Sequence, residues 1–226
     1  MTPLSCEAAS VPAAAEVLPP IAVPSHSEAD HRIANSLQIL GALLGLQARD
    51  SGSEEIAEAL GAASRRVAAI SAVHRQLYKS ATGRHIELAA YLDELALGLE
   101  EGTSPVRPGR AVRVSAVEVH VGAEQAIAVG VLVTELVLNA WKHAYRPGAC
   151  GDILIDVDRR SDGMLRLEVR DFGRGLARQP SAAAPGMGTR VIEAMARKLG
   201  GRYSYRDAQP GTAFTLEADL DVWLRQ

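Results

Sequence analysis

The chain has 226 residues, which is enough for one large domain or for a small helical module beside one compact domain. Its 24 lysines and arginines stand against 27 acidic residues, so it lacks the basic excess of a typical nucleic-acid-binding protein, and no nucleic-acid partner is expected. The longest uncharged stretch of the expected folded part, residues 33–48, is shorter than the about 20 residues of a membrane-spanning helix and contains Asn35 and Gln38.

The N-terminal segment is expected to be disordered and not to direct secretion. Residues 1–24 hold five of the 11 prolines and only two charged residues, so they cannot bury enough apolar surface to offset the entropy of ordering. A secretory signal begins with positive charge, but Lys and Arg are absent before Arg32. Cys6 and Cys150 lie far apart and are expected to be reduced thiols. A cytoplasmic protein without membrane association is predicted.

Residues 25–82 are predicted to form a helical hairpin. The first helix repeats apolar residues at spacings of four, three and four, at Ile33, Leu37, Leu40 and Leu44. After a turn, Ser53 is placed to cap a second helix. That helix carries a similar stripe of Ile56, Leu60, Ala63, Val67, Ile70 and Leu77. Because each stripe needs a partner, the hairpin can pair with its own copy into a four-helix bundle, and both a monomer and a homodimer stay open.

Residues 83–226 are predicted to form an α/β sandwich. Apolar periodicity indicates helices at about 86–100, 124–145 and 189–199. Alternating apolar residues indicate strands around 112–114, 153–157 and 165–169, and a final pair whose second strand includes 212–218. Since the strands come in runs with helices on one side, the sheet should be largely antiparallel, and the chain belongs to the α+β class.

The expected long helix carries four polar residues on one face. At 100° per residue, Glu135, Asn139, Lys142 and His143 share that face, and the opposite face is apolar and can pack on a sheet. A solvated polar face is the ordinary interpretation of such a pattern. The following strand ends on Asp171, which shares the inward face with apolar residues and therefore needs a hydrogen-bond partner or a ligand.

Three glycine-containing turns follow in order. Gly173 and Gly175 come directly after Asp171 and allow the backbone to approach another group closely. Gly186 and Gly188 precede a helix, whose free N–H groups and dipole favour an anion. Gly211 and Thr212 open the last strand. Each turn alone is ordinary turn chemistry. Taken together and in this order, with the polar helix, they form a strong signal.

This ordered set over about residues 85–220 resembles the ATP-binding domain of histidine kinases, the Bergerat-type fold shared with gyrase, Hsp90 and MutL-like ATPases. The resemblance implies that Glu135 and Asn139 organise Mg²⁺ and the triphosphate, with Asn139 as a metal ligand. It implies that Lys142 and His143 lie against phosphate and nucleotide, and that Asp171 accepts a hydrogen bond from the adenine amino group. Gly186 and Gly188 would flank a lid over the phosphates.

The hairpin resembles the phosphoacceptor region of one histidine kinase subfamily. Asp30-His31-Arg32-Ile33-Ala34-Asn35-Ser36-Leu37-Gln38 is similar to its His-Arg-Val-Lys-Asn-Asn-Leu-Gln box, and residues 43–49 and 65–78 also fit. Helical geometry independently places His31 on the face opposite the apolar stripe, with Asn35 and Gln38, where an ATP-binding domain or a partner can reach it. An isolated surface histidine would be read as merely solvated, but the surrounding box favours a phosphoacceptor.

The sequence therefore predicts a cytoplasmic histidine kinase without a sensor domain before His31. ATP and Mg²⁺ would serve a reaction in which His31 attacks the γ-phosphorus, with Glu135 assisting proton removal or orienting metal-bound water. The phosphoryl group would pass to an aspartate of a response-regulator receiver domain. Two alternatives stay open: a histidine phosphotransferase that does not use ATP, and an ATP-gated switch that sequesters a partner, with His31 incidental.

Overall fold

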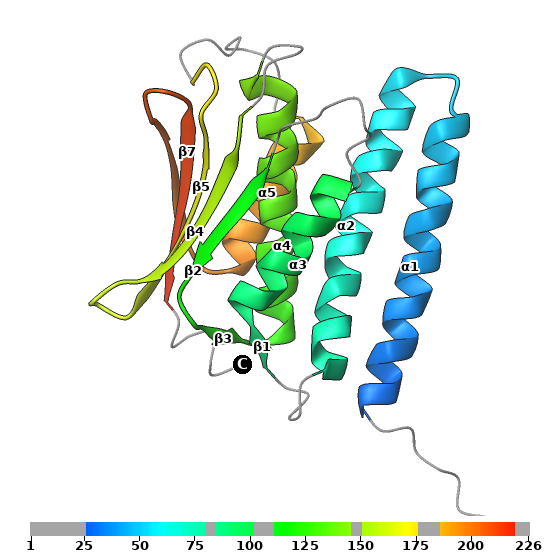
Figure 1. Ribbon diagram of the computed structural model, residues 1–226, viewed down its shortest axis with the longest axis horizontal. Helices are drawn as coiled ribbons and strands as arrows, with labels where there is room; N and C mark the ends of the chain where they lie inside the picture. The colour runs from blue at the N-terminus through cyan, green and yellow to red at the C-terminus, as the bar shows by residue number, and fades with distance from the viewer. Residues whose placement is uncertain (1–25, 80–84, 102–110, 146–150, 176–185, 220–226) are drawn as a thin grey trace, which may run out of the picture.

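The computed structural model describes residues 26–79, 85–101, 111–145, 151–175 and 186–219. The predicted tail of residues 1–24 and the predicted domain boundary after residue 82 lie outside these ranges. The described chain forms four layers in Figure 1: a sheet, a layer of helices on one of its faces, the second helix of the hairpin, and the first helix outermost.

The hairpin consists of α1 (His26–Asp50) and α2 (Glu54–Lys79). Ser53 caps α2 as predicted, because its Oγ accepts a hydrogen bond from the Ile56 amide at 3.4 Å. The two helices approach closely along small residues of α1. Ser71 Oγ donates to the Ala34 carbonyl at 3.1 Å, and Ser64 Oγ donates to the Gly41 carbonyl at 2.9 Å.

The predicted apolar stripe of α1 is only partly correct. Leu37 and Leu44 are half-buried against α2, but Ile33 and Leu40 keep 42% and 46% of their surface exposed. Ala34 is buried on the α2 side instead. The small residues let the two backbones approach, and this close packing leaves the larger side chains on the outer face of α1.

The second helix of the hairpin is part of the main core. Ala69, Ala72, Val73 and Leu77 of α2 belong to the same buried cluster as α3 (Leu88–Glu101) and α4 (Ala123–Asn139). Tyr91 of α3 is fully buried there, and its hydroxyl donates to the Ala69 carbonyl at 3.1 Å. Gly130 of α4 leaves the space that this ring occupies, because a Cβ at 130 would overlap the Tyr91 hydroxyl.

The main sheet has the strand order β2-β4-β5-β7-β6. Its strands are β2 (Val112–Ala116), β4 (Ile153–Arg159), β5 (Met164–Asp171), β6 (Arg202–Asp207) and β7 (Thr212–Asp219). Only the β2–β4 pair is parallel among these described neighbours, so the prediction of a largely antiparallel sheet is confirmed. A separate short pair joins β1 (Ile86–Glu87) to β3 (His120–Val121). The alternating apolar residues of β4, β5 and β7 are buried beneath α4 and α5 (Met187–Lys198).

The long predicted helix changes its geometry before it ends. α4 is α-helical, and a π-helical turn, η1 (Ala140–Ala144), continues it. Arg174 holds this turn, because its Nε donates to the His143 carbonyl at 2.6 Å and its amide donates to the Ala144 carbonyl at 3.0 Å. The helix 123–144 has the length and hydropathy of a membrane span, but 72% of its most apolar window is buried within the fold, as in a core helix.

Candidate functional site

Two adjoining cavities lie at the C-terminal end of α4. The larger, of about 840 Å³, is enclosed by α2, by α4 and η1, and by the start of α5. The smaller, of about 400 Å³, lies between α4 with η1 and the strands β5, β6 and β7. Asn139, His143 and Thr189 line both cavities, so a single extended ligand can occupy the two.

The smaller cavity combines an apolar wall with one buried carboxylate. Asp171 is 8% exposed, and its Oδ1 accepts hydrogen bonds from the amides of Gly173 at 2.9 Å and Thr212 at 3.2 Å. No described residue donates to its Oδ2, which is left to accept from a ligand. The apolar and aromatic lining consists of Leu136, Ala140, Ala144, Val169, Tyr205 and Phe214. This cavity suits a flat heterocycle that carries an amino group.

Aromatic packing stiffens the strand side of this cavity. The rings of Tyr205 and Phe214 meet edge to face, with centroids 5.1 Å apart. Partial burial raises the pKa of the Tyr205 hydroxyl from 10 to about 12, so the side chain is neutral well beyond pH 7. The wall is therefore uncharged except at Asp171.

Glycines let the turns close around Asp171. Gly211 has a φ of +91°, and a Cβ there would overlap the Asp171 carbonyl oxygen. A Cβ at Gly173 would overlap the Ala144 carbonyl. Gly175, with a φ of +75°, lies against Asp207. These three glycines shape the turns and do not line either cavity.

The larger cavity is lined by charged residues of both signs. Glu135 is only 3% exposed and accepts two hydrogen bonds from Arg66 of α2, Nε to Oε1 at 2.7 Å and Nη2 to Oε2 at 3.0 Å. Lys142 Nζ lies 2.5 Å from Glu58 Oε1, also on α2. Burial lowers the pKa of His143, with further lowering by the charges of Lys142 and Arg174. Its ring is therefore mostly neutral at pH 7.

The start of α5 forms the far side of this cavity. Gly186 is the N-cap residue of α5 and no side chain in the described ranges caps the helix, so the first amides are available to an anion. Gly188 leaves room beside two polar side chains, because a Cβ there would lie 2.9 Å from Glu135 Oε2 and 3.5 Å from Asn139 Oδ1. Within the described ranges, no group of three or more His, Cys, Asp and Glu could hold a metal ion. A metal here would need oxygen atoms from its ligand as well as from the protein.

The structure brings most of the predicted site residues together. Glu135, Asn139, Lys142, His143, Gly186 and Gly188 line the larger cavity, and Asp171 and Thr212 line the smaller one with Asn139 and His143. They come from segments more than 70 residues apart in the sequence, on α4, η1, β5, α5 and β7.

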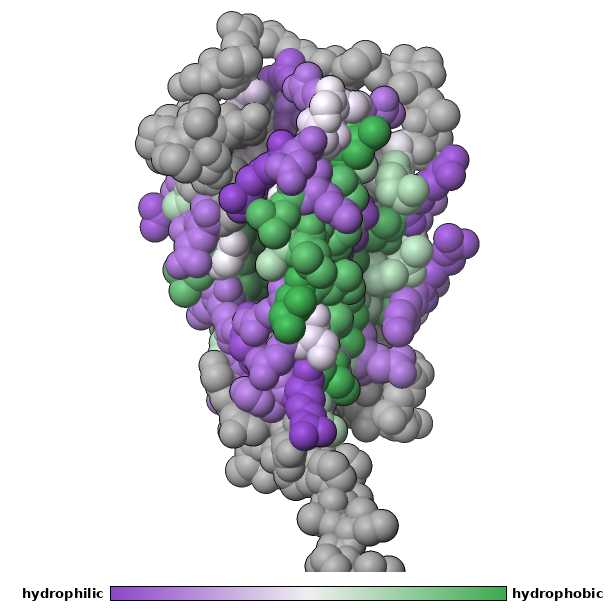
Figure 2. Space-filling view, turned by 90° about the vertical axis from the view of Figure 1, so that its right-hand side faces the viewer, coloured by the Kyte–Doolittle hydropathy of each residue, from purple (hydrophilic) through white to green (hydrophobic). Residues whose placement is uncertain are grey.

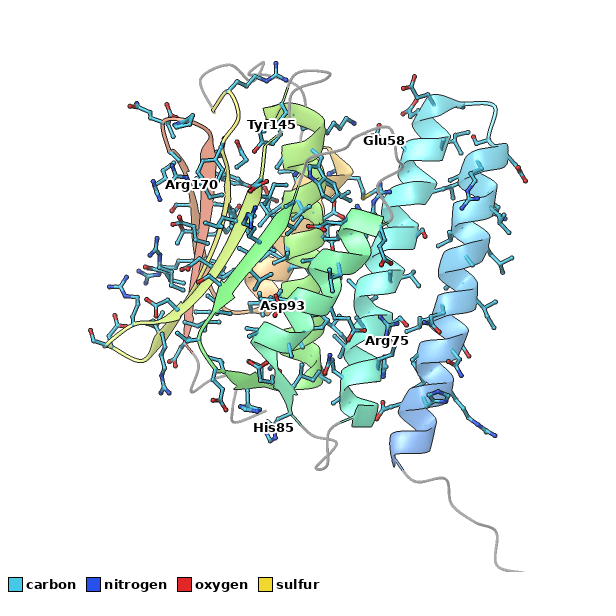
Figure 3. All side chains as sticks on the ribbon, in the orientation of Figure 1. Glu58, Arg75, His85, Asp93, Tyr145 and Arg170 are labelled. Carbon is cyan, nitrogen blue, oxygen red and sulfur yellow. The ribbon has the colours of Figure 1, made fainter. Side chains whose placement is uncertain are left out.

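His31 lies away from both cavities. Its Nδ1 is 3.4 Å from Asn35 Nδ2 near the start of α1, and the neighbouring Asp30 pairs with His74 near the end of α2 at 2.9 Å. The larger cavity is lined by the other half of α2, from Glu55 to Arg66. A helical rise of 1.5 Å per residue separates His74 from Arg66 by about 12 Å and from Glu58 by about 24 Å along α2. In Figure 3, Glu58 and Tyr145 lie at one end of the molecule, and Arg75 lies farther along α2.

The sequence patterns predict no role for the α2 residues that form one wall of the larger cavity. Glu55, Glu58, Ala59, Ala62, Arg65 and Arg66 follow the i, i+3, i+4, i+7 spacing of one helical face. That spacing was visible in the sequence, but nothing in it said that this face meets α4. Tyr205 was also missed, because β6 is exposed along its length and has no alternating pattern.

Comparisons with known proteins agree with the geometry. A family described as "Histidine kinase" matches residues 28–102, and one described as "Histidine kinase-like ATPase domain" matches residues 105–217. The chain therefore belongs to the histidine kinases, as the resemblance in its sequence predicted, and this family membership implies ATP binding.

Two curated proteins named as histidine kinases are similar to this chain. The chain is 34% identical to the sensor histidine kinase PdtaS of Mycobacterium tuberculosis over 88% of its own length and 38% of that protein. It is 27% identical to blue-light-activated histidine kinase 2 of Erythrobacter litoralis, over 86% of its length and 56% of that protein. The chain thus spans about two-fifths to just over half of these relatives.

A solved structure supports the fold. The histidine kinase domain of the Erythrobacter litoralis EL346 blue-light activated kinase superimposes with a TM-score of 0.64 at 24% identity, covering 88% of this chain and 95% of that domain. The predicted order of a helical hairpin followed by an α/β sandwich is confirmed.

Proposed function

We propose that this chain is an ATP-dependent histidine kinase that phosphorylates His31 and passes the phosphoryl group to an aspartate of a response-regulator receiver domain. The observation that carries the proposal is the pair of adjoining cavities, one with a carboxylate in an apolar wall and one with cations and a free helix N-terminus. Such a pair matches the two halves of ATP, an aminopurine base and a triphosphate.

The base would lie in the smaller cavity. Asp171 Oδ2 would accept a hydrogen bond from the adenine amino group, while Oδ1 stays bonded to the Gly173 and Thr212 amides. Leu136, Val169 and Tyr205 would contact the ring. Adenine presents an amino group at C6, where guanine in the same orientation presents a carbonyl oxygen that cannot donate to the carboxylate, so Asp171 would favour adenine over guanine.

The triphosphate would extend past Asn139 into the larger cavity. Asn139 and Glu135 offer oxygen atoms that suit Mg²⁺, which usually keeps few protein ligands and takes the rest from phosphates and water. When bound, Mg²⁺ would offset the charge of the phosphates. Lys142 would move from Glu58 to a phosphate oxygen, and the amides at the start of α5 would donate to another.

His31 would attack the γ-phosphorus through a ring nitrogen. The new N–P bond would form as the bond from the γ-phosphorus to the bridging oxygen breaks, and ADP would leave with that electron pair. The ring must also lose a proton, and Glu135 is the proposed acceptor. Since both Glu135 oxygens are bonded to Arg66, Arg66 must release one of them for this role.

The partner that presents His31 would be a second copy of the chain. Figure 2 shows an apolar band along the outer face of the hairpin. The exposed apolar residues of the hairpin are Ile33, Ile39, Leu40, Leu43 and Leu46 of α1 and Ile56 of α2. Pairing of these faces would build a four-helix bundle, cover the band and explain why the stripe of α1 is incompletely buried in one chain.

The receiver domain would reach His31 on the exposed face of the hairpin. We infer a cytoplasmic reaction, because ATP and receiver domains are the expected substrates, and we infer no role for nucleic acid or membrane. The near balance of 24 basic and 27 acidic residues supports this.

The test is labelling with γ-labelled ATP and Mg²⁺. Wild-type protein should acquire acid-labile, alkali-stable label, and His31→Gln and Asn139→Ala should both lose it. Label that survives in His31→Gln would exclude His31 as the acceptor. Absence of label although nucleotide binds would favour the phosphotransferase or the ATP-gated partner switch.

A further inference from the structure

Arg65 of α2 is the cation in the larger cavity that the proposed function does not use. It is consecutive with Arg66, and both line the cavity. Arg66 is fully engaged with Glu135 through two hydrogen bonds. Arg65, in contrast, makes no hydrogen bond or ion pair with any residue in the described ranges, and its Nε is buried without a partner.

An unpartnered guanidinium in a half-buried position is an unusual arrangement. Burial lowers the pKa of Arg65, while the charges of Glu135 and Glu58 act in the opposite direction. Arginine nevertheless stays protonated in proteins, so the buried Nε–H of this cation has lost water without gaining an acceptor. Buried polar groups without a partner call for an explanation, and an anionic ligand supplies one.

The surroundings of Arg65 leave room for such a ligand. One turn before it on the same face, Ala62 and Ala59 are small, so the cavity wall along α2 is open. Lys142 and the uncapped start of α5 line the same cavity. Arg66 offsets the charge of Glu135, which would otherwise repel an anion beside Arg65. The guanidinium fork also matches two oxygen atoms of one phosphoryl group.

We propose that Arg65 binds the terminal phosphoryl group of ATP, so that the hairpin completes the triphosphate site of its own chain. The inference rests on the proposed function for the orientation of the nucleotide. With the base at Asp171 and the α- and β-phosphates passing Asn139, the terminal phosphoryl group is the part of ATP that reaches the wall formed by α2. ADP, which lacks the terminal phosphoryl group, would not reach Arg65.

This contact would make the packing of α2 on α4 sensitive to the nucleotide. ATP would connect α4, α5 and α2, whereas ADP would contact only the first two. Because coupling between two equilibria is reciprocal, ATP would stabilise the docked hairpin by the same factor as docking strengthens ATP binding. Loss of the γ-phosphoryl group would release this connection.

The experiment compares ATP with ADP on the purified full chain. Calorimetric titration with the non-hydrolysable β,γ-imido analogue of ATP and with ADP is carried out on wild type, Arg65→Ala and Arg65→Lys. Arg160→Ala is the matched control, because Arg160 lies on the β4–β5 turn, pairs with Asp162 and Glu217, and is far from the cavities. Arg65→Ala should weaken binding of the ATP analogue about tenfold or more and leave ADP within about twofold.

Two further results separate a binding role from a structural one. Arg65→Lys should recover part of the preference for the ATP analogue, because it keeps the charge but not the fork. Arg160→Ala should match wild type for both ligands. Equal weakening of both ligands in Arg65→Ala, or no change in either, would overturn the inference while leaving the proposed function standing. A wild-type chain that binds neither ligand would overturn both.

Discussion

The two regions that must meet for phosphotransfer differ in how completely one chain builds them. The nucleotide cavities have walls from seven elements of the same chain, and their two key carboxylates, Glu135 and Asp171, are buried and already hydrogen-bonded. His31 lies on an exposed turn of α1 near His74, which is about 12 Å along α2 from Arg66, the nearest α2 residue of the cavity wall. The docked hairpin therefore holds the acceptor away from the nucleotide, and catalysis needs either a second copy or a movement of the hairpin.

The largest effect should come from mixing two inactive variants. His31→Gln keeps the nucleotide site, and Asn139→Ala keeps the acceptor, so neither should label alone. If a second copy presents its histidine, a mixture should restore label from none to a readily detected level, and only on the Asn139→Ala chain. Gel separation of a size-tagged pair after incubation with γ-labelled ATP measures this.

The outer face of the hairpin supplies the control for this mixing experiment. Leu43 is 53% exposed in the apolar band, and Leu43→Glu in the Asn139→Ala chain should abolish the restored label without affecting the cavities. If the mixture stays unlabelled while wild type labels, the reaction occurs within one chain. The hairpin would then have to leave its place on α4.

The next largest effect concerns the ion pair that joins the two regions. Arg66→Met would leave the buried Glu135 carboxylate without its partner and should destabilise the fold by about 3 kcal/mol, at the lower end for breaking a buried pair because Arg66 is 22% exposed. Arg113→Met is the matched control. Arg113 pairs with Asp152 at the same 2.7 Å distance but at the surface, where water screens the pair, so its loss should destabilise the fold far less.

Chemical unfolding of both variants measures this difference. An Arg66→Met variant as stable as Arg113→Met would show that burial adds nothing to the pair. The hairpin would then be held to α4 by apolar packing of Ala69, Ala72 and Val73 alone.

A smaller effect is expected at the base. Asp171→Asn keeps an oxygen for the Gly173 and Thr212 amides but exchanges the free acceptor for a donor. ATP binding should weaken about tenfold, and the preference for ATP over GTP should narrow, as measured by calorimetric titration. Asp156→Asn, on the strand beside β5 but outside both cavities, should change neither. An unchanged preference for ATP over GTP in Asp171→Asn would mean that another group recognises the base.

Local patterns account for what the sequence could predict. The alternation of Ile153, Ile155 and Val157 predicts a strand that is buried on one face, and Ser53 predicts the start of α2. Both predictions succeed because strand alternation and helix capping depend only on residues that are close in the sequence. The glycines at 173 and 211 stand out in the sequence because they lie in turns next to strand ends. The structure shows the backbone carbonyls of Ala144 and Asp171 that would overlap a Cβ at these two positions.

Contacts between distant segments account for the features that the sequence could not predict. The four-residue apolar stripe of α1 is typical of a helix–helix interface, yet the small residues Ala34 and Gly41 form the contact with α2. The sequence of α1 alone does not determine which of its faces packs against α2. Arg65 and Arg66 lie on a regular helical face whose neighbour is 69 residues farther along the chain at Glu135. Helical periodicity reveals such a face and does not say what covers it.

The smallest effect is the pH dependence of His143 at the junction of the two cavities. Burial, Lys142 and Arg174 lower its pKa below the ordinary value of 6.5, so an NMR titration of the ring should give a midpoint below 6.5. The unfolded chain then binds more protons than the folded one as the pH falls below 6.5, and stability contributed by His143 is lost as the pH falls through the folded-state pKa. Above 6.5 the residue should contribute no pH dependence. The slope should be small, because much of the side chain is exposed to water.

Two variants sharpen this last prediction. His143→Asn should unfold with a flatter dependence on pH between about 6.5 and the folded-state midpoint than wild type does. Lys142→Met should raise the midpoint of His143 part of the way towards 6.5, because one of the two neighbouring positive charges is gone. A midpoint that stays in place in Lys142→Met would assign the shift to burial and to Arg174. A wild-type midpoint above 6.5 would mean that the ring gains a negatively charged neighbour in solution, and Glu58, released from Lys142, is the carboxylate placed to be that neighbour.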